Sequence, residues 1–158
     1  MVGGGSIDPW SSEQSTDYDR MIEQFGLSPM DLGSLPNPGM LHRRGIVFAH
    51  RDMDVITDSI SNQEPFGVLT GLMPSGRMHL GHSMVIEQVR WFQEQGADVT
   101  VAVADLEALV TRGTSLSEGR KTALREYVSN YAALGLDPNK TNVYFQSSRP
   151  EVQRLAFT

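Results

Sequence analysis

Three short stretches of the chain carry the apolar and β-branched residues that are typical of strands. Phe66–Thr70 reads Phe-Gly-Val-Leu-Thr, Asp98–Ala104 reads Asp-Val-Thr-Val-Ala-Val-Ala, and Asn142–Gln146 reads Asn-Val-Tyr-Phe-Gln. The middle stretch is a nearly continuous run of small and β-branched residues, which is expected of a buried strand in a parallel sheet. The pattern therefore predicts three strands.

Apolar residues at helical spacing follow the first strand. They predict a helix that begins at Gly81 or His82 and runs through Gln95, with Gly96 as its C-cap.

A second helix is expected between the second and third strands. Ser115 and Glu118 have the spacing of a capping box, which opens a helix. Gly135 and Pro138 would stop it, and Pro150 is placed to begin a further helix at its first turn. The predicted apolar stripe of the second helix consists of Leu124, Tyr127, Val128, Tyr131 and Leu134.

Strands and helices thus alternate along the second half of the chain. This order is typical of an α/β fold with a Rossmann-like parallel sheet and right-handed crossovers. Three strands make half of a doubly wound nucleotide-binding fold, and the chain stops at Thr158 just inside its next helix. We therefore expect the N-terminal portion of a larger catalytic domain.

The region before the first strand has a different character. Residues 1–16 are polar and rich in Gly and Ser, which predicts a mobile tail. Residues 17–64 are interpreted as an N-terminal extension, and residues 65–158 as the partial Rossmann-like catalytic domain. Within the extension we expect, in order, a helix at 17–25, a loop at 28–41 and a helix at 54–60.

Composition narrows the classes of protein that fit. A chain of 158 residues with 39% hydrophobic and 20% charged residues is typical of a folded domain. The net charge of −6 argues against general affinity for nucleic acid, and the lack of cysteine excludes disulfides and thiolate metal sites. No apolar run approaches the roughly 18 residues that span a bilayer, and no signal-peptide pattern is present. The predicted location is the cytoplasm.

The string Pro-Ser-Gly-Arg-Met-His-Leu-Gly-His, residues 74–82, lies where the first strand passes into the first helix. A helix N-terminus presents unpaired N–H groups and partial positive charge, both of which attract phosphate. Imidazoles at His79 and His82 can donate hydrogen bonds to phosphate oxygens as charge develops. The alternatives are a surface pair without a role and a zinc-binding pair. A complete metal shell is hard to assemble, because His42 and His50 lie in another segment.

These residues carry a family resemblance. The string 74–82 resembles the ATP signature of class I aminoacyl-tRNA synthetases, in the form found in the tyrosyl and tryptophanyl branch. Arg43–Asp52 is similar to a segment of archaeal and eukaryotic tryptophanyl enzymes, and Ala104–Ala108 to the archaeal members of both branches. The spacing to Leu134–Pro138 and Val143–Gln146 is similar too. Over residues 17–158 the chain is most similar to archaeal-type tryptophanyl-tRNA synthetases.

The resemblance implies roles for the signature residues. His79 and His82 would contact the ATP phosphates and stabilise the charge that builds when the amino acid carboxylate attacks the α-phosphorus. Gly81 would let the adenine lie against the backbone, while Ser75 and Gly76 would shape the turn beneath the nucleotide. Magnesium would accompany ATP as substrate, and no protein-bound metal is expected. The implied ATP-binding set is Pro74, Ser75, Gly76, Arg77, Met78, Leu80 and Gly81.

The amino-acid pocket is implied by residues at the other strands. Asp105 and Glu107 follow the second strand, at the edge where open α/β sheets bind ligands. They would bind the substrate amino group; the alternative is helix capping or a solvated turn. The pocket would also include Leu69, Gly71 and Ala102. Many eukaryotic-type tryptophanyl enzymes have Tyr and Gln at the positions of Leu69 and Ala102, so this chain departs from that pattern.

The resemblance implies ATP-dependent activation of tryptophan to tryptophanyl-adenylate, followed by transfer to tRNA(Trp). Tryptophan, ATP and tRNA would be the partners, with a homodimer as the family's assembly and with no DNA or membrane involved. The family's Lys-Met-Ser-Lys-Ser loop does not occur in the chain. We therefore expect weak ATP binding and no turnover by these 158 residues alone.

Three alternatives stay open. One is tyrosine as the substrate, because both branches carry the Pro-Ser-Gly turn. Another is a small nucleotidyltransferase, although the usual Phe-Asp-Pro-x-His spacing does not match residues 73–78. The last is a non-catalytic nucleotide-binding paralogue.

Overall fold

The computed structural model describes residues 18–155, and these divide into two compact units, one up to Asp58 and one from Ser59. The boundary expected from the sequence lay between residues 64 and 65. The predicted tail at residues 1–16 lies outside the described residues.

The first unit consists of short elements. Helix α1 spans Tyr18–Phe25, and strand β1 (Ser28–Pro29) pairs antiparallel with strand β2 (Ala49–His50). Helix α2 (Met40–Arg43) lies between these strands in sequence, and α3 (Met53–Ser61) follows them across the division between the units. The prediction of a loop throughout 28–41 is therefore wrong at both ends. A strand of two residues is defined by its pairing with a strand that is distant in sequence, so no local sequence pattern predicts it.

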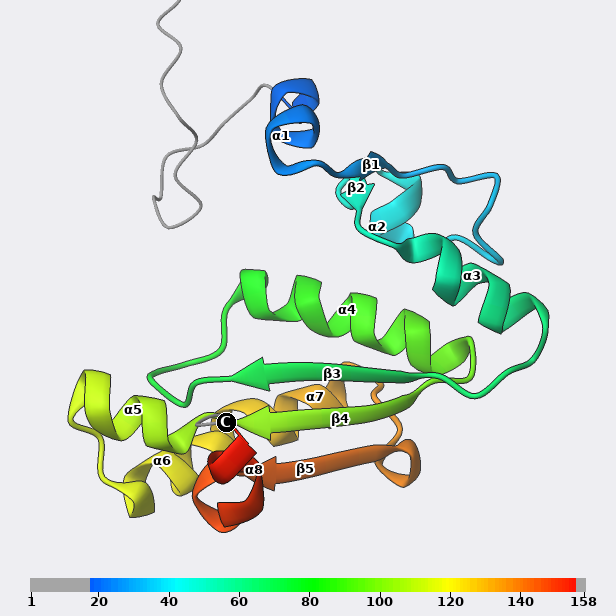
Figure 1. Ribbon diagram of the computed structural model, residues 1–158. Coiled ribbons are helices and arrows are strands. Elements are labelled where there is room, and N and C mark those ends of the chain that lie inside the picture. The colour runs from blue at the N-terminus through cyan, green and yellow to red at the C-terminus, as the bar shows by residue number, and fades with distance from the viewer. Residues whose placement is uncertain (1–17, 156–158) are drawn as a thin grey trace, which may run out of the picture. The chain divides into compact units, whose positions relative to one another are not determined.

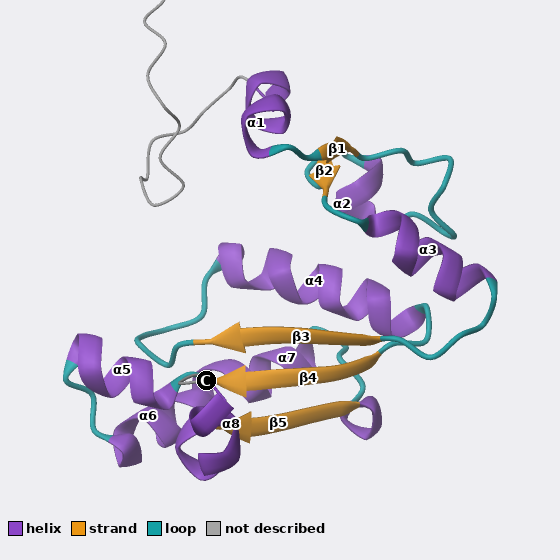
Figure 2. Ribbon diagram, viewed as in Figure 1, coloured by secondary structure: helices purple, strands orange, loops and turns teal. Residues whose placement is uncertain are grey.

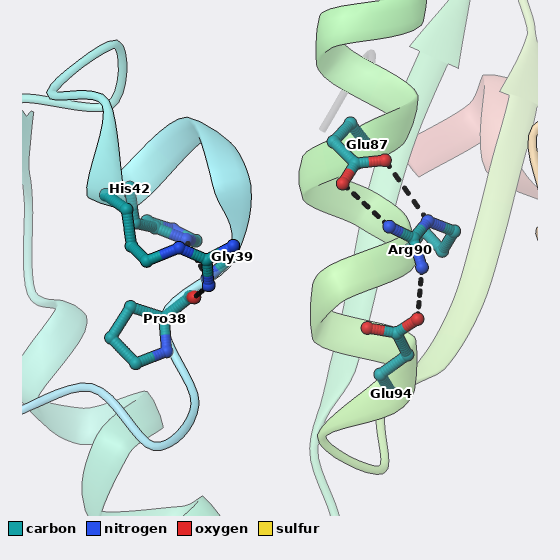
Figure 3. A network of polar contacts seen from close by, with 7 residues as sticks. Pro38, Gly39, His42, Glu87, Arg90 and Glu94 are labelled. Atoms are coloured by element: carbon teal, nitrogen blue, oxygen red, sulfur yellow. Dashed lines mark hydrogen bonds and ion pairs between the residues drawn. The ribbon is translucent and has the colours of Figure 1, made fainter.

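Two histidines of this unit act on backbone groups. His42 Nδ1 accepts a hydrogen bond of 3.1 Å from the N–H of Gly39, which begins α2, and Arg43 donates to the carbonyl of Pro38. The left side of Figure 3 shows Pro38, Gly39 and His42. His50 Nδ1 likewise accepts from the N–H of Met53, at 3.1 Å, at the start of α3. Both imidazoles thus stabilise a helix start.

The second unit is built on a three-stranded parallel sheet. Its strands are β3 (Gly67–Leu72), β4 (Asp98–Val103) and β5 (Thr141–Phe145), in the order β3-β4-β5. Leu72, Val103 and Phe145 pair across the sheet, so the three strands end level with one another, and their arrows point the same way in Figure 1. The predicted Rossmann-like α/β fold is confirmed. Strand β3 runs two residues beyond the predicted end at Thr70, because Gly71 and Leu72 continue the ladder with β4.

Helices connect and follow these strands, as Figure 2 shows. The predicted first helix is α4, and the capping box of Ser115 and Glu118 is confirmed, because the Ser115 hydroxyl accepts from the Glu118 N–H at 3.2 Å. A helix directly after β4, α5, was not expected.

No helix within residues 18–155 is long and apolar enough to cross a membrane. The elements are α4 (Leu80–Glu94), α5 (Asp105–Arg112), α6 (Leu116–Thr122), a π-helical segment η1 (Ala123–Val128), α7 (Ser129–Ala133), the 3₁₀ turns η2 (Pro138–Lys140) and η3 (Gln146–Ser148), and α8 (Pro150–Leu155).

The core lies between the sheet and the helices α4, η1 and α7. Alternate residues of β4 are fully buried there together with Ile86 and Val89 of α4. The predicted stripe of the second helix is wrong in part: Tyr127 and Tyr131 are buried, but Leu124 is 52% exposed and Leu134 39% exposed. Leu124 lies in the π-helical segment, whose wider turn shifts it out of the buried row, and Leu134 is the C-cap residue of α7.

A buried amide fastens α4 to the connection before β5. The side-chain N–H₂ of Gln93 lies 2.9 Å from Thr141 Oγ1 and 3.3 Å from the Lys140 carbonyl, and its oxygen accepts from the Asp137 N–H at 2.7 Å. Gln93 is 5% exposed, so these partners replace water. This tie sits at the amino-terminal edge of the sheet, opposite the edge that carries the signature residues.

The exposed side of α4 carries an ion-pair network. Arg90 donates to both carboxylate oxygens of Glu87, at 2.7 and 3.1 Å, and also contacts Glu94 (Figure 3). These pairs raise the pKa of Arg90, chiefly through the hydrogen bonds to Glu87. Because the three side chains are partly exposed, the network contributes only a few tenths of a kcal/mol.

Candidate active site

The signature turn is anchored against the helices that follow β4. Pro74 is fully buried, and a Cβ placed on Gly119 of α6 would lie 3.6 Å from Pro74 Cγ. Met73 Sδ accepts a hydrogen bond of 3.7 Å from the Thr111 hydroxyl of α5. The turn therefore rests on α5 and α6 at the carboxyl ends of the strands, while Ser75, Gly76 and Arg77, all exposed, form its outer surface.

His79 and His82 together form the start of α4. His79 is the N-cap residue, with extended backbone, and its carbonyl accepts from the His82 N–H at 2.9 Å. His82 stands at the third helical position, and its Nδ1 accepts from the His79 N–H at 3.3 Å. An imidazole that accepts at Nδ1 carries its proton on Nε2 when it is neutral. The donor of the neutral His82 ring is therefore its Nε2–H.

The two imidazole rings are close neighbours. Their centroids lie 3.9 Å apart with the ring planes at 47°, and His79 is exposed while His82 is half-buried. Burial lowers the pKa of His82, and the proximity of His79 lowers it further. A Cβ placed on Gly81 would lie 3.1 Å from Cε1 of the His79 ring, so glycine at this position leaves room for that ring. The predicted histidine pair is thus brought together at the first turn of a helix.

A hollow of about 390 Å³ opens beside His79. It lies between the first turns of α4 and the helix α7, and most of its surface is apolar. Leu80 on its rim is 78% exposed, and Met78 is half-buried against the core. Its lining residues are Met78, His79, Leu80, Ser83, Asn130, Ala133 and Leu134.

Tyr127 lies next to His82, whereas its sequence pattern predicted only a place in the core. Its ring meets His82 edge to face, with centroids 5.3 Å apart and planes at 85°. Burial raises the pKa of Tyr127. Its place in the predicted apolar stripe was the available signal.

The two acidic residues after β4 lie in different surroundings. Only Ala104 separates β4 from α5, which begins at Asp105. Asp105 is 1% exposed; its Oδ1 accepts from the Ser147 N–H at 3.0 Å, and its Oδ2 accepts from the Ser147 hydroxyl. Glu107 is exposed. The structure therefore directs Asp105 inward to the end of β5 and leaves Glu107 as the accessible carboxylate.

The other three predicted pocket residues share one face of the sheet. Gly71 and Ala102 are partners in register on β3 and β4, and Leu69 lies two residues before Gly71. This face is opposite to the side chains that pack in the core. Leu69 is 72% exposed and Ala102 is half-buried.

No cluster of three or more His, Asp or Glu side chains that could hold a metal ion occurs among residues 18–155. The nitrogens of His42, His50 and His82 that accept from backbone N–H groups stabilise helix starts instead.

Comparisons with known proteins agree with this geometry. A sequence model of the family described as tRNA synthetases class I (W and Y) matches residues 61–158. The chain belongs to this family of class I tRNA synthetases. The predicted resemblance is thereby confirmed, and the fold is that of the class I synthetases.

Similar proteins include synthetases for tryptophan. Tryptophan--tRNA ligase of Methanosarcina acetivorans is 44% identical over 153 residues, and that of Methanopyrus kandleri 46% identical over 156 residues. The alignments cover 96% and 95% of this chain, but 35% and 41% of those ligases. The chain thus spans about two fifths or less of the length of these relatives.

Two solved structures share the fold. The tryptophanyl-tRNA synthetase of Aeropyrum pernix K1 superimposes with a TM-score of 0.80 at 42% identity, covering 90% of this chain and 41% of that one. A tryptophanyl-tRNA synthetase of Encephalitozoon cuniculi, bound to tryptophan, gives a TM-score of 0.72 at 30% identity, covering 84% and 42%.

Proposed function

We propose that this synthetase chain contributes the nucleotide-binding and amino-acid-binding residues of a tryptophan–tRNA ligase. The reaction is ATP-dependent activation of tryptophan to tryptophanyl-adenylate, followed by transfer to tRNA. The observation that carries the proposal is the pairing of His79 and His82 at the first turn of α4, where the centroids of their rings lie 3.9 Å apart. The relatives named tryptophan–tRNA ligase support tryptophan as the amino acid.

The activation step places demands that this site can meet. An oxygen of the tryptophan carboxylate attacks the α-phosphorus of ATP, the bond from that phosphorus to the bridging oxygen breaks, and pyrophosphate leaves. Negative charge builds on the phosphate oxygens, and magnesium enters with ATP as part of the substrate. His82 donates from Nε2 to these oxygens. Donors fixed before the reaction stabilise the transition state without having to reorganise.

The remaining signature residues shape the site around these donors. The N–H of Ser75 donates to the Met73 carbonyl at 2.8 Å, so this group supports the turn rather than binding phosphate. Pro74 seats that turn, and Gly81 leaves space beside His79. Arg77, Met78 and Leu80 complete the surface that the nucleotide meets.

The amino acid is proposed to lie along the outer face of the sheet. Leu69, Gly71 and Ala102 line this face, and the accessible carboxylate of Glu107 receives the ammonium group of the substrate. Asp105 belongs to the same region as a buried support, because both of its oxygens are bonded to Ser147.

ATP binding by the chain tests the proposal directly. Titration with ATP should shift the NMR signals of the His79 and His82 rings and leave those of His42 and His50 in place, because the latter are engaged at other helix starts. Replacing His79 by Ala should weaken ATP binding on the order of tenfold, the effect of losing one hydrogen bond to a charged group. His50→Ala is the matched control and should bind ATP normally. Equal responses of the two variants would contradict the assignment.

The choice of amino acid needs its own measurement, because the family includes enzymes for tryptophan and for tyrosine. In the presence of a non-hydrolysable ATP analogue, tryptophan should bind the chain more tightly than tyrosine. Glu107→Gln should weaken the binding of tryptophan, since it removes the charge opposite the ammonium group, whereas substitution of the nearby exposed Arg112 should not. Preference for tyrosine would contradict the proposal.

A further inference from the structure

We propose that Tyr144 is a specificity-determining residue, whose ring forms the wall against which the aromatic side chain of the bound amino acid packs. The inference rests on the proposed function of the outer face of the sheet and adds a contact residue on β5, a strand on which the sequence predicted no site residue. In this assignment Tyr144 touches the side chain of the substrate and takes no part in the activation step.

Tyr144 lies on the same face of the sheet as the predicted amino-acid pocket. Val143 and Phe145, its neighbours in β5, pack against the core, so Tyr144 between them faces the opposite way. It is the partner in register of Ala102, which in turn pairs with Gly71. Adjacent strands lie about 4.8 Å apart, so the half-buried Tyr144 stands one strand from the middle of the pocket.

The sizes of the side chains on this face fit a flat aromatic group. Gly71 has no side chain and Ala102 has a single methyl group, so these two residues form a floor with open space above it. Leu69 bounds this floor toward the amino-terminal edge of β3, and Tyr144 bounds it on the side of β5. The exposed carboxylate of Glu107 follows at the carboxyl edge, where it is assigned to the ammonium group.

A floor of small residues beside an aromatic wall favours a large, flat substrate side chain. Leu69, Gly71 and Ala102 offer no polar side-chain group, so recognition over them depends on shape and on contact with Tyr144. Aromatic rings attract one another in offset-stacked and edge-to-face arrangements, beyond the effect of burial. Indole has a larger ring surface than phenol, so tryptophan gains more than tyrosine from this contact.

Arg149 restrains the ring of Tyr144. Its guanidinium carbon lies 5.8 Å from the centroid of that ring, within the range of a cation–π contact. The Arg149 carbonyl accepts from the N–H groups of Val152 and Gln153, at 3.1 and 3.2 Å, which fixes its backbone at the start of α8. The ring is thus held before the substrate arrives, and such preorganisation reduces the cost of ordering on binding.

Two variants of Tyr144 test the contact, because Tyr144→Ala removes the wall and Tyr144→Phe keeps the ring. In the presence of a non-hydrolysable ATP analogue, Tyr144→Ala should bind tryptophan about two- to tenfold more weakly, the range for one aromatic pair. Its preference for tryptophan over tyrosine should fall as well, which a loss of folding alone would not cause. Tyr144→Phe should bind tryptophan as the wild type does.

Asn142→Ala is the matched control, because Asn142 lies on the same strand and face, two residues nearer the amino-terminal edge. It should leave the affinity for tryptophan unchanged, and the ATP analogue should bind normally to all three variants. Wild-type affinity for tryptophan in Tyr144→Ala would overturn the proposal, as would an equal loss in Asn142→Ala.

Gly71→Ala raises the floor instead of removing the wall. The added Cβ would lie 3.7 Å from the Ala102 carbonyl oxygen, an ordinary contact, and the backbone of Gly71 lies outside the left-handed region. The fold should therefore accept alanine, with an unchanged or higher midpoint of unfolding in urea, while tryptophan binding becomes weaker. Undiminished binding of tryptophan would show that its side chain does not lie on this floor and would contradict the proposal.

Intermolecular nuclear Overhauser effects test the contact without any variant. The indole protons of bound tryptophan should show contacts with the ring protons of Tyr144. Tyr131, which is buried in the core on the other face, should show none. Bound tryptophan without contacts to Tyr144 would refute its role.

Failure of this inference can be told apart from failure of the proposed function. If the wild-type chain binds no tryptophan in the presence of the ATP analogue, the proposed function fails, and the role of Tyr144 fails with it. If tryptophan binds and responds to Glu107→Gln but not to Tyr144→Ala, only the role of Tyr144 fails.

Discussion

His82 uses its two ring nitrogens for different tasks. Nδ1 accepts from the His79 N–H and stabilises the helix start, and Nε2 is the nitrogen that is proposed to donate to ATP. Protonation would add a hydrogen at Nδ1 and break the contact with the backbone, which agrees with the lowered pKa of this ring. In the free chain the geometry therefore fits the neutral imidazole.

The pKa of His82 should make ATP binding depend on pH. Burial and the neighbouring His79 lower this pKa in the free chain, and bound phosphate should raise it, because opposite charge favours the imidazolium. Binding then takes up a proton, so affinity for ATP should rise as pH falls from 7.5 and level off below the pKa of the free chain.

Calorimetric titration across this range measures the effect. His82→Gln is the control, since glutamine at the third helical position can still accept from the N-cap N–H but cannot titrate. The titration of ATP itself is common to both proteins. Equal pH dependence in the two would show that His82 is not responsible.

Gly81 makes a separate prediction at the residue scale. The backbone of Gly81 lies outside the left-handed region, so alanine should be tolerated in the helix and should stabilise it by up to about 1 kcal/mol. The added Cβ would lie 3.1 Å from Cε1 and 3.2 Å from Nδ1 of His79, so this ring must move. Gly81→Ala should therefore keep or increase the free energy of unfolding in urea and weaken ATP binding, with altered His79 ring signals. A loss of stability together with unchanged ATP binding would contradict this reasoning.

Much of the residue-level site could be predicted because the signature string is local. His79, His82 and the turn that precedes them are neighbours in sequence, so their grouping needs no knowledge of the tertiary fold. Asp105 shows the limit. Its partner Ser147 lies 42 residues away, and no local pattern announces such a partner.

At the scale of elements, the regular pieces were predictable and the irregular one was not. The apolar residues of strand β4 repeat every two positions, and those of helix α4 repeat every 3.6 positions, so both elements can be recognised from the sequence. The segment from Leu116 to Ala133 instead passes through a π turn, and a stripe drawn at constant helical spacing misplaces Leu124 and Leu134. Helix α5 was missed because it begins one residue after β4, without a separate turn to mark it.

The π turn predicts which substitutions the second crossover tolerates. Leu124→Gln should change the free energy of unfolding by no more than about 0.5 kcal/mol, because the side chain is half in solvent. Tyr131→Ala should cost about 3 to 5 kcal/mol, because it leaves a cavity in the core. Denaturation in urea measures both. A large cost for Leu124→Gln would mean that the segment is a regular α-helix in solution.

At the scale of the second unit, two buried side chains bind the chain segments that precede and follow β5, at opposite edges of the sheet. Gln93 binds the connection before β5 at the amino edge, and Asp105 binds the turn after β5 at the carboxyl edge. Both ties join residues more than 40 positions apart, so neither is visible in the periodic pattern. They hold β5 in its place next to β4, and with it the end of the sheet where ligands are proposed to bind.

The two ties should differ in their effect on ligand binding. Gln93→Met keeps the side-chain length but leaves the Asp137 N–H without its acceptor, which should cost about 1 to 3 kcal/mol of unfolding free energy. ATP affinity should stay normal, because the loss is at the far edge. Ser147→Ala removes a donor to Asp105, and should lower stability and weaken tryptophan binding together. Loss of ATP binding in a folded Gln93→Met variant would show that the edges are coupled.

Ala104 is the only residue between β4 and α5, and this short connection leaves Glu107 little freedom to change its position. A carboxylate on a long loop could move toward its ligand. Glu107, one helical turn after a central strand, keeps a fixed position, so the ligand must bind where this carboxylate already lies. One extra residue at this junction would rotate the helix by about 100° and carry the carboxylate to a different side. Relatives that select another amino acid are therefore expected to exchange side chains here and to keep the length of the junction.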